Sequence, residues 1–312
     1  MENNTQSGHL KKSIQSWFDT YSVKPVTDND KRIDWIRAAP FIAMHLACVL
    51  VFIVGWSPIA VTVAVLLYAM RMFAITGFYH RYFSHRAFKT SRFMQFVFAA
   101  LGATAVQRGA LWWAAHHRIH HVTSDKENDQ HSPKKHGLFW SHLGWFLSRG
   151  NFSTELDRVS DFSKYAELRF LDRYDVLVPV IFAAVIYLFG LLLELYFPQL
   201  QTNGMQMLVW GFFVSTVFLY HGTFTINSLA HTLGKKVFPS NDDSRNNFLL
   251  ALITMGEGWH NNHHYYPGSA RQGFMWWEID MTYYGLLLMK KMGLIWDLRD
   301  VPQRVYEKRR SL

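Results

Sequence analysis

Residues 38–70 read AAPFIAMHLACVLVFIVGWSPIAVTVAVLLYAM and contain no Asp, Glu, Lys or Arg. A single helix over these 33 residues would be about 50 Å long, which exceeds the roughly 30 Å hydrocarbon core of a bilayer. The sequence GWSP at 55–58 interrupts the run, because Gly and Pro break helices. The stretch therefore predicts two membrane spans, over about 38–55 and 59–77.

A second pair of uncharged stretches follows later in the chain. Residues 176–193 are strongly apolar, and residues 195–234 are again free of charge. Pro198 and Gly204 bound the turn expected between them. The pattern predicts two further spans, over about 176–196 and 205–230. We therefore expect an all-α integral membrane protein with four transmembrane helices in two hairpins.

The basic residues all fall on one predicted side of the membrane. All 32 Lys and Arg precede residue 38, lie within 71–173 or follow residue 234, so the two short opposite loops carry none. The positive-inside tendency then predicts that both termini and the polar segments are cytoplasmic. This distribution accounts for the net charge of +9 without a nucleic-acid partner, for which the chain has no motif.

The domain organisation follows from the same pattern. Helically spaced apolar residues near the N-terminus beside Lys11 and Lys12 fit an interfacial helix, or equally an amphipathic helix packed on the domain. The predicted parts are an N-terminal cytoplasmic segment, 1–37, and a single domain, 38–312, whose cytoplasmic helical cap comprises 78–175 and 231–312.

Histidine clusters carry the strongest functional signal. The only cysteine is Cys48, which excludes a disulfide framework, a Cys-ligated zinc site and an iron–sulfur cluster. Of the 16 His, eight form one H-x-x-x-x-H group and two H-x-x-H-H groups, all on the predicted cytoplasmic face. In an H-x-x-H-H group the three imidazoles lie on one helical face, where they can converge on a small volume.

So many imidazoles exceed what one ion can coordinate. Imidazole nitrogen suits iron, copper, zinc and nickel, so a two-metal centre is the simplest interpretation. His231 and Asn227, near the end of the fourth span, add a ninth imidazole and an amide. The candidate metal ligands are His80, His85, His117, His120, His121, Asn227, His231, His260, His263 and His264.

The chain resembles the membrane fatty-acyl desaturases of the acyl-CoA, stearoyl-CoA delta-9 type, in a bacterial form. The resemblance rests on the histidine groups and on GFYHR at 77–81, GLFWSHLGW at 137–145, NSLAH at 227–231 and GEGWHNNHH at 256–264. It implies that the nine His bind two iron ions, with Asn227 reaching one of them through water. One departure is His116, where animal members commonly have an acidic residue, and we leave it outside the ligand set. His131, His136 and His142 lie near these groups, and we expect structural or supporting roles for them.

The resemblance also implies a reaction. Breaking an unactivated methylene C–H bond needs an oxidant that no side chain supplies. With two Fe²⁺ ions and O₂, the family converts a saturated acyl chain, here as a CoA thioester, to a cis-monounsaturated product at the ninth carbon. The electrons must come from a separate donor, such as a ferredoxin, a rubredoxin or a small haem protein with its reductase, because the chain has no flavin or nicotinamide motif. The expected location is a bacterial inner membrane.

Several residues are candidates for substrate binding. By resemblance Trp113 lines an acyl tunnel beside the metals, Gln107 lies near its mouth, and Lys134 and Lys135 face the CoA phosphates. Tyr68 and Ala64 precede His80 by about 18 and 24 Å along a helix, so we expect them to close the tunnel. Core packing or ordinary solvation is the alternative for each. The candidate substrate-binding residues are therefore Trp113, Gln107, Tyr68, Ala64, Lys134 and Lys135.

Two other functions remain open. A hydroxylase or epoxygenase also begins by attacking an acyl C–H bond on this scaffold. A non-catalytic membrane metal-binding protein is a rival from another class, although transport sites usually lie near the middle of the membrane. The sequence does not separate acyl-CoA from acyl-lipid or acyl-carrier-protein substrates, and it does not show which His binds which ion.

Overall fold

The structure is a computed structural model that describes residues 14–22 and 30–311. Within these ranges the chain is mostly helical, and its only strands are β1 (Lys89–Thr90) and β2 (Ile295–Trp296), which pair antiparallel. The all-α prediction is confirmed. The part of the predicted interfacial helix before residue 14 lies outside the described residues.

The first apolar hairpin runs through a tight turn. Its segments are α2 (Trp35–Ala47), the 3-10 turn Cys48–Leu50, α3 (Val51–Val54), α4 (Pro58–Phe73) and a π-helical continuation, Ala74–Ser84. Gly55 has a φ of 68°, a left-handed value that favours glycine. Ser57 then caps α4, because its Oγ accepts a hydrogen bond from the Ala60 backbone N–H at 3.0 Å.

The second hairpin is held by close glycine contacts. Its segments are α11 (Leu177–Tyr196), the 3-10 turn Pro198–Leu200, α12 (Gly204–Met207), the π-helical segment Leu208–Val214, α13 (Ser215–Ser228) and the 3-10 turn Leu229–His231. A Cβ at Gly190 would lie 2.7 Å from the Asn203 carbonyl oxygen. Only glycine lets α11 approach the start of α12 so closely.

Within residues 14–22 and 30–311, four helices are long and apolar enough to cross a membrane. They are Trp35–Val54, Pro58–Ser84, Leu177–Tyr196 and Gly204–His231. Large apolar side chains cover their outer faces, for example Phe52, which is 88% exposed. An outer surface of this kind suits lipid rather than water. The prediction of four spans in two hairpins is confirmed.

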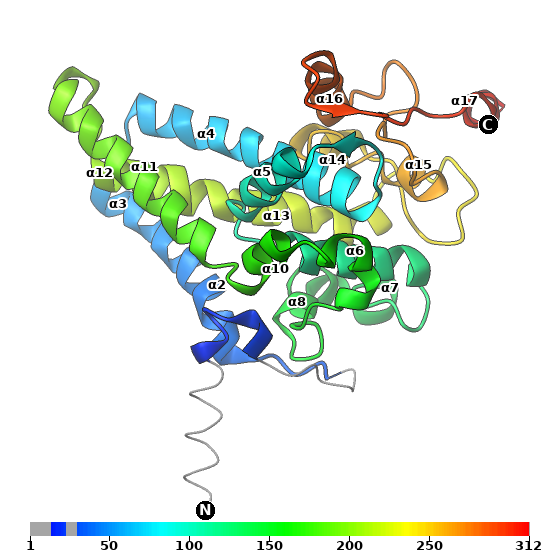
Figure 1. Ribbon diagram of the computed structural model, residues 1–312, viewed down its shortest axis with the longest axis horizontal. Coiled ribbons are helices and arrows are strands. Elements are labelled where there is room, and N and C mark those ends of the chain that lie inside the picture. The colour runs from blue at the N-terminus through cyan, green and yellow to red at the C-terminus, as the bar shows by residue number, and fades with distance from the viewer. Residues whose placement is uncertain (1–13, 23–29, 312) are drawn as a thin grey trace, which may run out of the picture.

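The remaining helices form a cap at one end of the spans (Figure 1). They are α5 (Arg92–Ala103), α6 (Ala110–Thr123), α7 (Pro133–His136), α8 (Trp145–Leu147), α9 (Ser160–Ser163), α10 (Ala166–Arg173), α14 (Phe248–Ile253), α15 (His260–Tyr265), α16 (Met281–Lys291) and α17 (Gln303–Arg310), with short turns at Trp140–Gly144 and Leu156–Val159.

Packing of α5 onto the π-helical end of the second span fixes the cap. The Phe78 and Phe98 rings stack with centroids 3.9 Å apart. Gly102 meets the Tyr79 ring so closely that an added Cβ would lie 2.0 Å from it. Phe78 and Tyr79 directly precede His80 in the chain, so this packing holds the first histidine group in place.

Candidate metal centre

Four separate elements present the candidate histidines at the junction of the spans and the cap. His80 lies in the π-helical segment after α4, and His85 directly follows that segment. The second and third groups lie on α6 and α15, and His231 ends the fourth apolar helix. All nine are buried or half-buried.

One set of imidazoles forms what we call the five-histidine cluster. One ring nitrogen from each member lies within 4.8 Å of those of all the others, and the members are His80, His85, His117, His121 and His263. The Nε2 atoms of His85 and His117 are 2.8 Å apart, those of His117 and His121 are 3.0 Å apart, and those of His121 and His263 are 2.9 Å apart. Because ring nitrogens from several elements converge on one small volume, this arrangement fits a metal ion better than it fits a set of mutual hydrogen bonds.

The other set, the four-histidine cluster, comprises His120, His231, His260 and His264. The Nε2 atoms of His231 and His260 are 3.0 Å apart. Nε2 of His264 is buried and has no hydrogen-bond partner among the described residues. Because an unpaired buried ring nitrogen is costly, this atom is a natural metal ligand.

Each H-x-x-H-H group is divided between the two clusters, which the sequence did not predict. On α6, His117 and His121 belong to the five-histidine cluster and His120 to the four-histidine cluster. On α15, His263 belongs to the five-histidine cluster, whereas His260 and His264 belong to the four-histidine cluster. On a helix, positions i and i+4 lie about 40° apart, whereas i+3 lies about 60° to the other side of i. One turn therefore supplies ligands to two sites at once.

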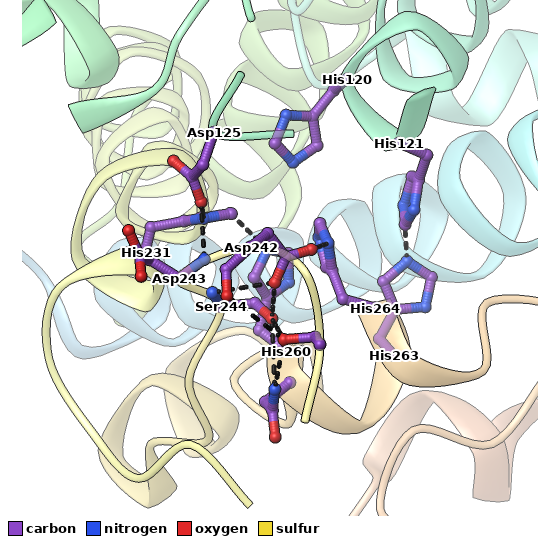
Figure 2. Close-up of polar contacts among 12 residues, drawn as sticks. His120, His121, Asp125, His231, Asp242, Asp243, Ser244, His260, His263 and His264 are labelled. Carbon is purple, nitrogen blue, oxygen red and sulfur yellow. Dashed lines mark hydrogen bonds and ion pairs between the residues drawn. The ribbon is translucent and has the colours of Figure 1, made fainter. Parts of the chain in front are cut away.

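Carboxylates hold the second ring nitrogen of four of these histidines. Glu257 Oε2 lies 2.5 Å from Nδ1 of His80, and Asp125 Oδ2 lies 2.9 Å from Nδ1 of His231. The other pairs are Asp242 with His264 at 2.6 Å and Asp129 with His120 at 3.3 Å. Figure 2 shows two of these carboxylates, Asp125 and Asp242, beside the four-histidine cluster. Such contacts fix the ring orientation and leave Nε2 free toward the site.

Electrostatics keep most of these rings neutral. Burial, followed by repulsion from neighbouring imidazoles, lowers the pKa of His85, His117, His121, His260 and His263 well below its usual range. Burial also lowers the pKa of His264, to about 4, against the opposing effect of Asp242. His120 is the exception: burial would lower its pKa, but Asp129 outweighs burial and raises it. Neutral imidazole is the form that binds a metal.

The residues present therefore fit a pair of metal ions. All nine donors are nitrogen, which suits iron and other transition metals rather than magnesium or calcium. Two compact sets of ring nitrogens match two ions, as the sequence suggested. A further group, of His120, Asp129 and His131, shares His120 with the four-histidine cluster. The His131 ring stacks on that of His120 with centroids 4.3 Å apart, so we interpret His131 as a residue that supports His120.

The other histidines near the site lie outside both clusters. Nδ1 of His116 lies 2.7 Å from the Gln130 side-chain oxygen. His136 contacts the Asp129 carbonyl at 2.9 Å, and His142 contacts Ser228 and His221 at 2.9 and 3.0 Å. These contacts suit the structural roles that we expected for His136 and His142, and they leave His116 outside the ligand set.

A cavity of about 440 Å³ reaches the five-histidine cluster. Its lining includes His117, Trp113, Gln107 and Asn227. The Trp113 ring stacks on His117 with centroids 5.0 Å apart, and the Gln107 side-chain amide donates to Thr223 Oγ1 at 3.1 Å. The volume is in the range of small-molecule sites. Asn227 therefore borders the cavity, and its part in metal binding stays a prediction.

Four of the predicted substrate residues do not line this cavity. The Tyr68 hydroxyl donates to the Ile253 carbonyl at 2.6 Å, and Ala64 is buried in α4. Lys134 pairs with Asp243 at 2.9 Å and Lys135 with Glu127. The cavity instead extends between the first and third spans, to Met44 and Ala183.

Sequence reasoning missed the four carboxylates behind the clusters. Asp125 and Asp129 follow His121 at intervals of four residues, and Glu257 precedes His260 by three. These spacings are signals that a search for acidic partners would find. Asp242, in contrast, is 22 residues from His264, and nothing local in the sequence marks it.

Comparison with known proteins gives a consistent result. The family model for fatty acid desaturase matches residues 30–287. An acyl-CoA 5-desaturase of Anemone leveillei is 35% identical over 92% of this chain and 88% of its own. The sn-1 stearoyl-lipid 9-desaturase of Anabaena variabilis is 34% identical over 86% of this chain and 94% of its own. A Delta-9 acyl-lipid desaturase of Arabidopsis thaliana is 34% identical over 86% and 84%.

Proposed function

The chain belongs to the fatty acid desaturase family, and from this premise we propose that it introduces a cis double bond into a saturated fatty acyl chain at a di-iron centre. The observation that carries the proposal is the position of the apolar cavity against one of two histidine clusters. We further propose the ninth carbon as the position of the double bond, as the sequence resemblance implies.

The reaction balance defines what the protein must supply. Removal of one hydrogen from each of two adjacent CH₂ groups, with O₂, two electrons and two protons, gives CH=CH and two waters. Two iron ions, when bound by the clusters, would supply the O₂ chemistry that no side chain provides. The nine imidazoles would hold the ions, and the four carboxylates keep four of those imidazoles oriented.

The cavity residues position the chain and exclude water. Trp113 lines the cavity and its ring stacks on that of His117, so an acyl chain against Trp113 would lie beside the five-histidine cluster. Other aromatic side chains, including Phe41, Phe146 and Phe224, line the cavity. An apolar wall of this kind favours a methylene chain over water and holds it in one orientation.

Electrons and topology complete the proposal. We propose an external donor, namely a ferredoxin, a rubredoxin or a small haem protein with its reductase. The basic residues of the cap favour an acidic partner. The positive-inside distribution supports a cytoplasmic cap and termini, in a bacterial inner membrane. The resemblance favours a CoA thioester as the acyl carrier. The relatives from Anabaena variabilis and Arabidopsis thaliana are, in contrast, named for lipid substrates.

Fatty-acid analysis tests the function. A host without its own desaturase would express the chain or its His120→Ala variant, and gas chromatography with mass spectrometry would give the profile. We expect new cis-monounsaturated acids with the native chain and none with the variant. Hydroxy or epoxy acids would replace the proposal with the sister chemistry. No new acid from iron-loaded protein, with each of the three donor classes co-expressed, would contradict catalysis on acyl chains.

A further inference from the structure

A cluster of arginines forms part of the cavity wall. Arg37 and Arg108 both line the cavity, and the guanidinium carbon of each lies 4.1 Å from the centroid of the Phe152 ring. Arg149 is the third member, with its Nε 3.9 Å from Asp34. Two of these cations therefore lie against one aromatic ring of the cavity wall, and Arg149 lies near Asp34, the partner of Arg37.

Two carboxylates form ion pairs with these arginines. Asp34 Oδ2 accepts from Nε of Arg37 at 2.9 Å, and Asp175 Oδ2 lies 2.7 Å from Nε of Arg108. The buried carboxylate of Asp172 also interacts electrostatically with Arg108. The Arg37 side chain is only 10% exposed, and its Nη1 is buried without a hydrogen-bond partner among the described residues. A buried guanidinium nitrogen without an acceptor is costly, so the site fits an anionic ligand.

The site lies where the membrane spans begin. Arg37 is in the first turn of α2, and Asp175, the partner of Arg108, comes two residues before α11. Exposed Trp35 at the start of α2 is typical of a membrane interface. The arginine cluster is therefore at the depth of lipid head groups, with the cavity beside the hydrocarbon region.

The cavity wall also reaches the outer surface of the spans. Pro40 on α2 and Val180 on α11 line the cavity, and both are exposed, Val180 by 59%. Their helices would face hydrocarbon, so a lipid could enter sideways without leaving the bilayer. A two-chain lipid fits this shape, because one chain can reach His117 while the second stays between the helices.

We propose that Arg37, with Arg108 beside it, binds the phosphate of a membrane phospholipid whose acyl chain occupies the cavity. This inference rests on the proposed desaturase function and names the carrier of the acyl chain. A phosphate matches a guanidinium in charge and in hydrogen-bond geometry. Coenzyme A also carries phosphates, but Lys134 and Lys135, which the sequence associated with it, are engaged by Asp243 and Glu127.

Native mass spectrometry of the metal-loaded protein in detergent tests the proposal without turnover. The probes are distearoylphosphatidylglycerol, distearoylglycerol, which lacks the phosphate, and stearoyl-CoA. The variants are Arg37→Gln, Arg37→Lys and the control Arg32→Gln, whose side chain is exposed and pairs with Asp30. Metal content of each variant reports whether it is folded.

We expect the phospholipid to bind the native protein at least about tenfold more tightly than the diacylglycerol, because a charge-assisted contact contributes that much. Arg37→Gln should abolish the difference, Arg37→Lys should retain part of it, and Arg32→Gln should leave it unchanged. Equal phospholipid binding by Arg37→Gln and native protein would overturn the phosphate site. Arg37-dependent binding of stearoyl-CoA alone would assign the site to a soluble thioester and overturn the lipid proposal.

The result is separable from the fate of the proposed function. Binding is read on purified protein, whereas desaturation is read as new double bonds in the host. A native chain that binds the phospholipid through Arg37 but makes no unsaturated product would contradict the enzyme function alone. Unsaturated products without phospholipid binding would contradict only the carrier.

Discussion

The two histidine clusters use the same ligand type in different surroundings. The five-histidine cluster has one carboxylate behind it, Glu257 on His80, whereas the four-histidine cluster has three, Asp125, Asp129 and Asp242. The cavity is lined by His117 of the first cluster and by no member of the second. Two clusters of the same ligand type therefore differ in the number of carboxylates behind them and in their contact with the cavity.

The difference in charge suggests a division of labour. Three aspartates around four imidazoles can offset the whole charge of a divalent ion, and ligating histidines backed by carboxylates bind more strongly. The five-histidine cluster relies on more imidazoles and less negative charge, and it borders the cavity through His117. We expect the four-histidine cluster to retain its metal more firmly and the five-histidine cluster to depend more on the cavity.

The largest effect should follow from removing one ligand in either cluster. His117→Ala and His260→Ala should each abolish detectable product, a loss of more than about a hundredfold, because even supporting residues cost 10- to 100-fold. Fatty-acid profiling measures this. His136→Gln, outside both clusters, is the matched control and should retain activity. Full activity in either alanine variant would break the two-cluster account.

Removing a carboxylate should act on one cluster only. Asp242→Asn should weaken metal binding at the four-histidine cluster by about 10- to 100-fold, since His264 loses its partner. Chelator titration followed by metal analysis measures the affinities of the two ions. The control is Asp243→Asn, because the neighbouring Asp243 side chain pairs with Lys134 instead. Equal weakening of both ions would contradict the separation of the clusters.

Changing the cavity should alter catalysis while metal content stays constant. Trp113→Ala removes the ring between the cavity and His117, so product formation should fall by about tenfold as the acyl chain loses its position. Trp276→Ala, at a side chain that is 80% exposed, is the control. A loss of metal from the Trp113 variant would show that this ring supports the cluster rather than the substrate.

Chain-length preference offers a finer test of the cavity. Ala183→Phe should shift the products to shorter chains, because it fills the space between the first and third spans. Tyr68→Ala, which the sequence predicted would favour longer chains, should leave the profile unchanged, because Tyr68 does not line the cavity. The opposite pair of results would place the end of the acyl site along α4.

The pH dependence of the metal-free protein tests the electrostatics of the clusters. The lowered pKa values of six cluster histidines mean that the unfolded chain takes up protons before the folded chain does, so stability falls as pH drops below about 6.5. His264, with a pKa of about 4, would alone contribute a loss of about 3 kcal/mol between pH 6.5 and 4. His120, whose pKa is raised, opposes this trend.

Thermal unfolding after chelation, measured from pH 7.5 to 4.5, tests the sign. A midpoint that stays constant or rises toward acid would contradict the neutral, buried clusters. Metal-loaded protein should resist acid further, since the ions compete with protons for the same nitrogens.

The sequence was a good guide wherever a pattern was local. Uncharged runs predicted the four spans, and the i, i+3, i+4 histidines predicted convergence. The division of each triplet between clusters depends on where α6 and α15 face each other, which is a tertiary property. The same holds for Asp242 on His264. Tyr68 was placed by helix length alone, and the direction of the cavity depends on how α2, α11 and α13 pack.

Metal stoichiometry by cluster tests the central claim most directly. Purified protein grown with iron would be analysed by plasma mass spectrometry beside His85→Ala and His260→Ala, which belong to different clusters. The account predicts about two iron ions per native chain and about one in each variant, because each cluster holds one ion. A native content of one ion or none under iron-replete conditions, or the loss of both ions in both variants, would contradict two separate sites.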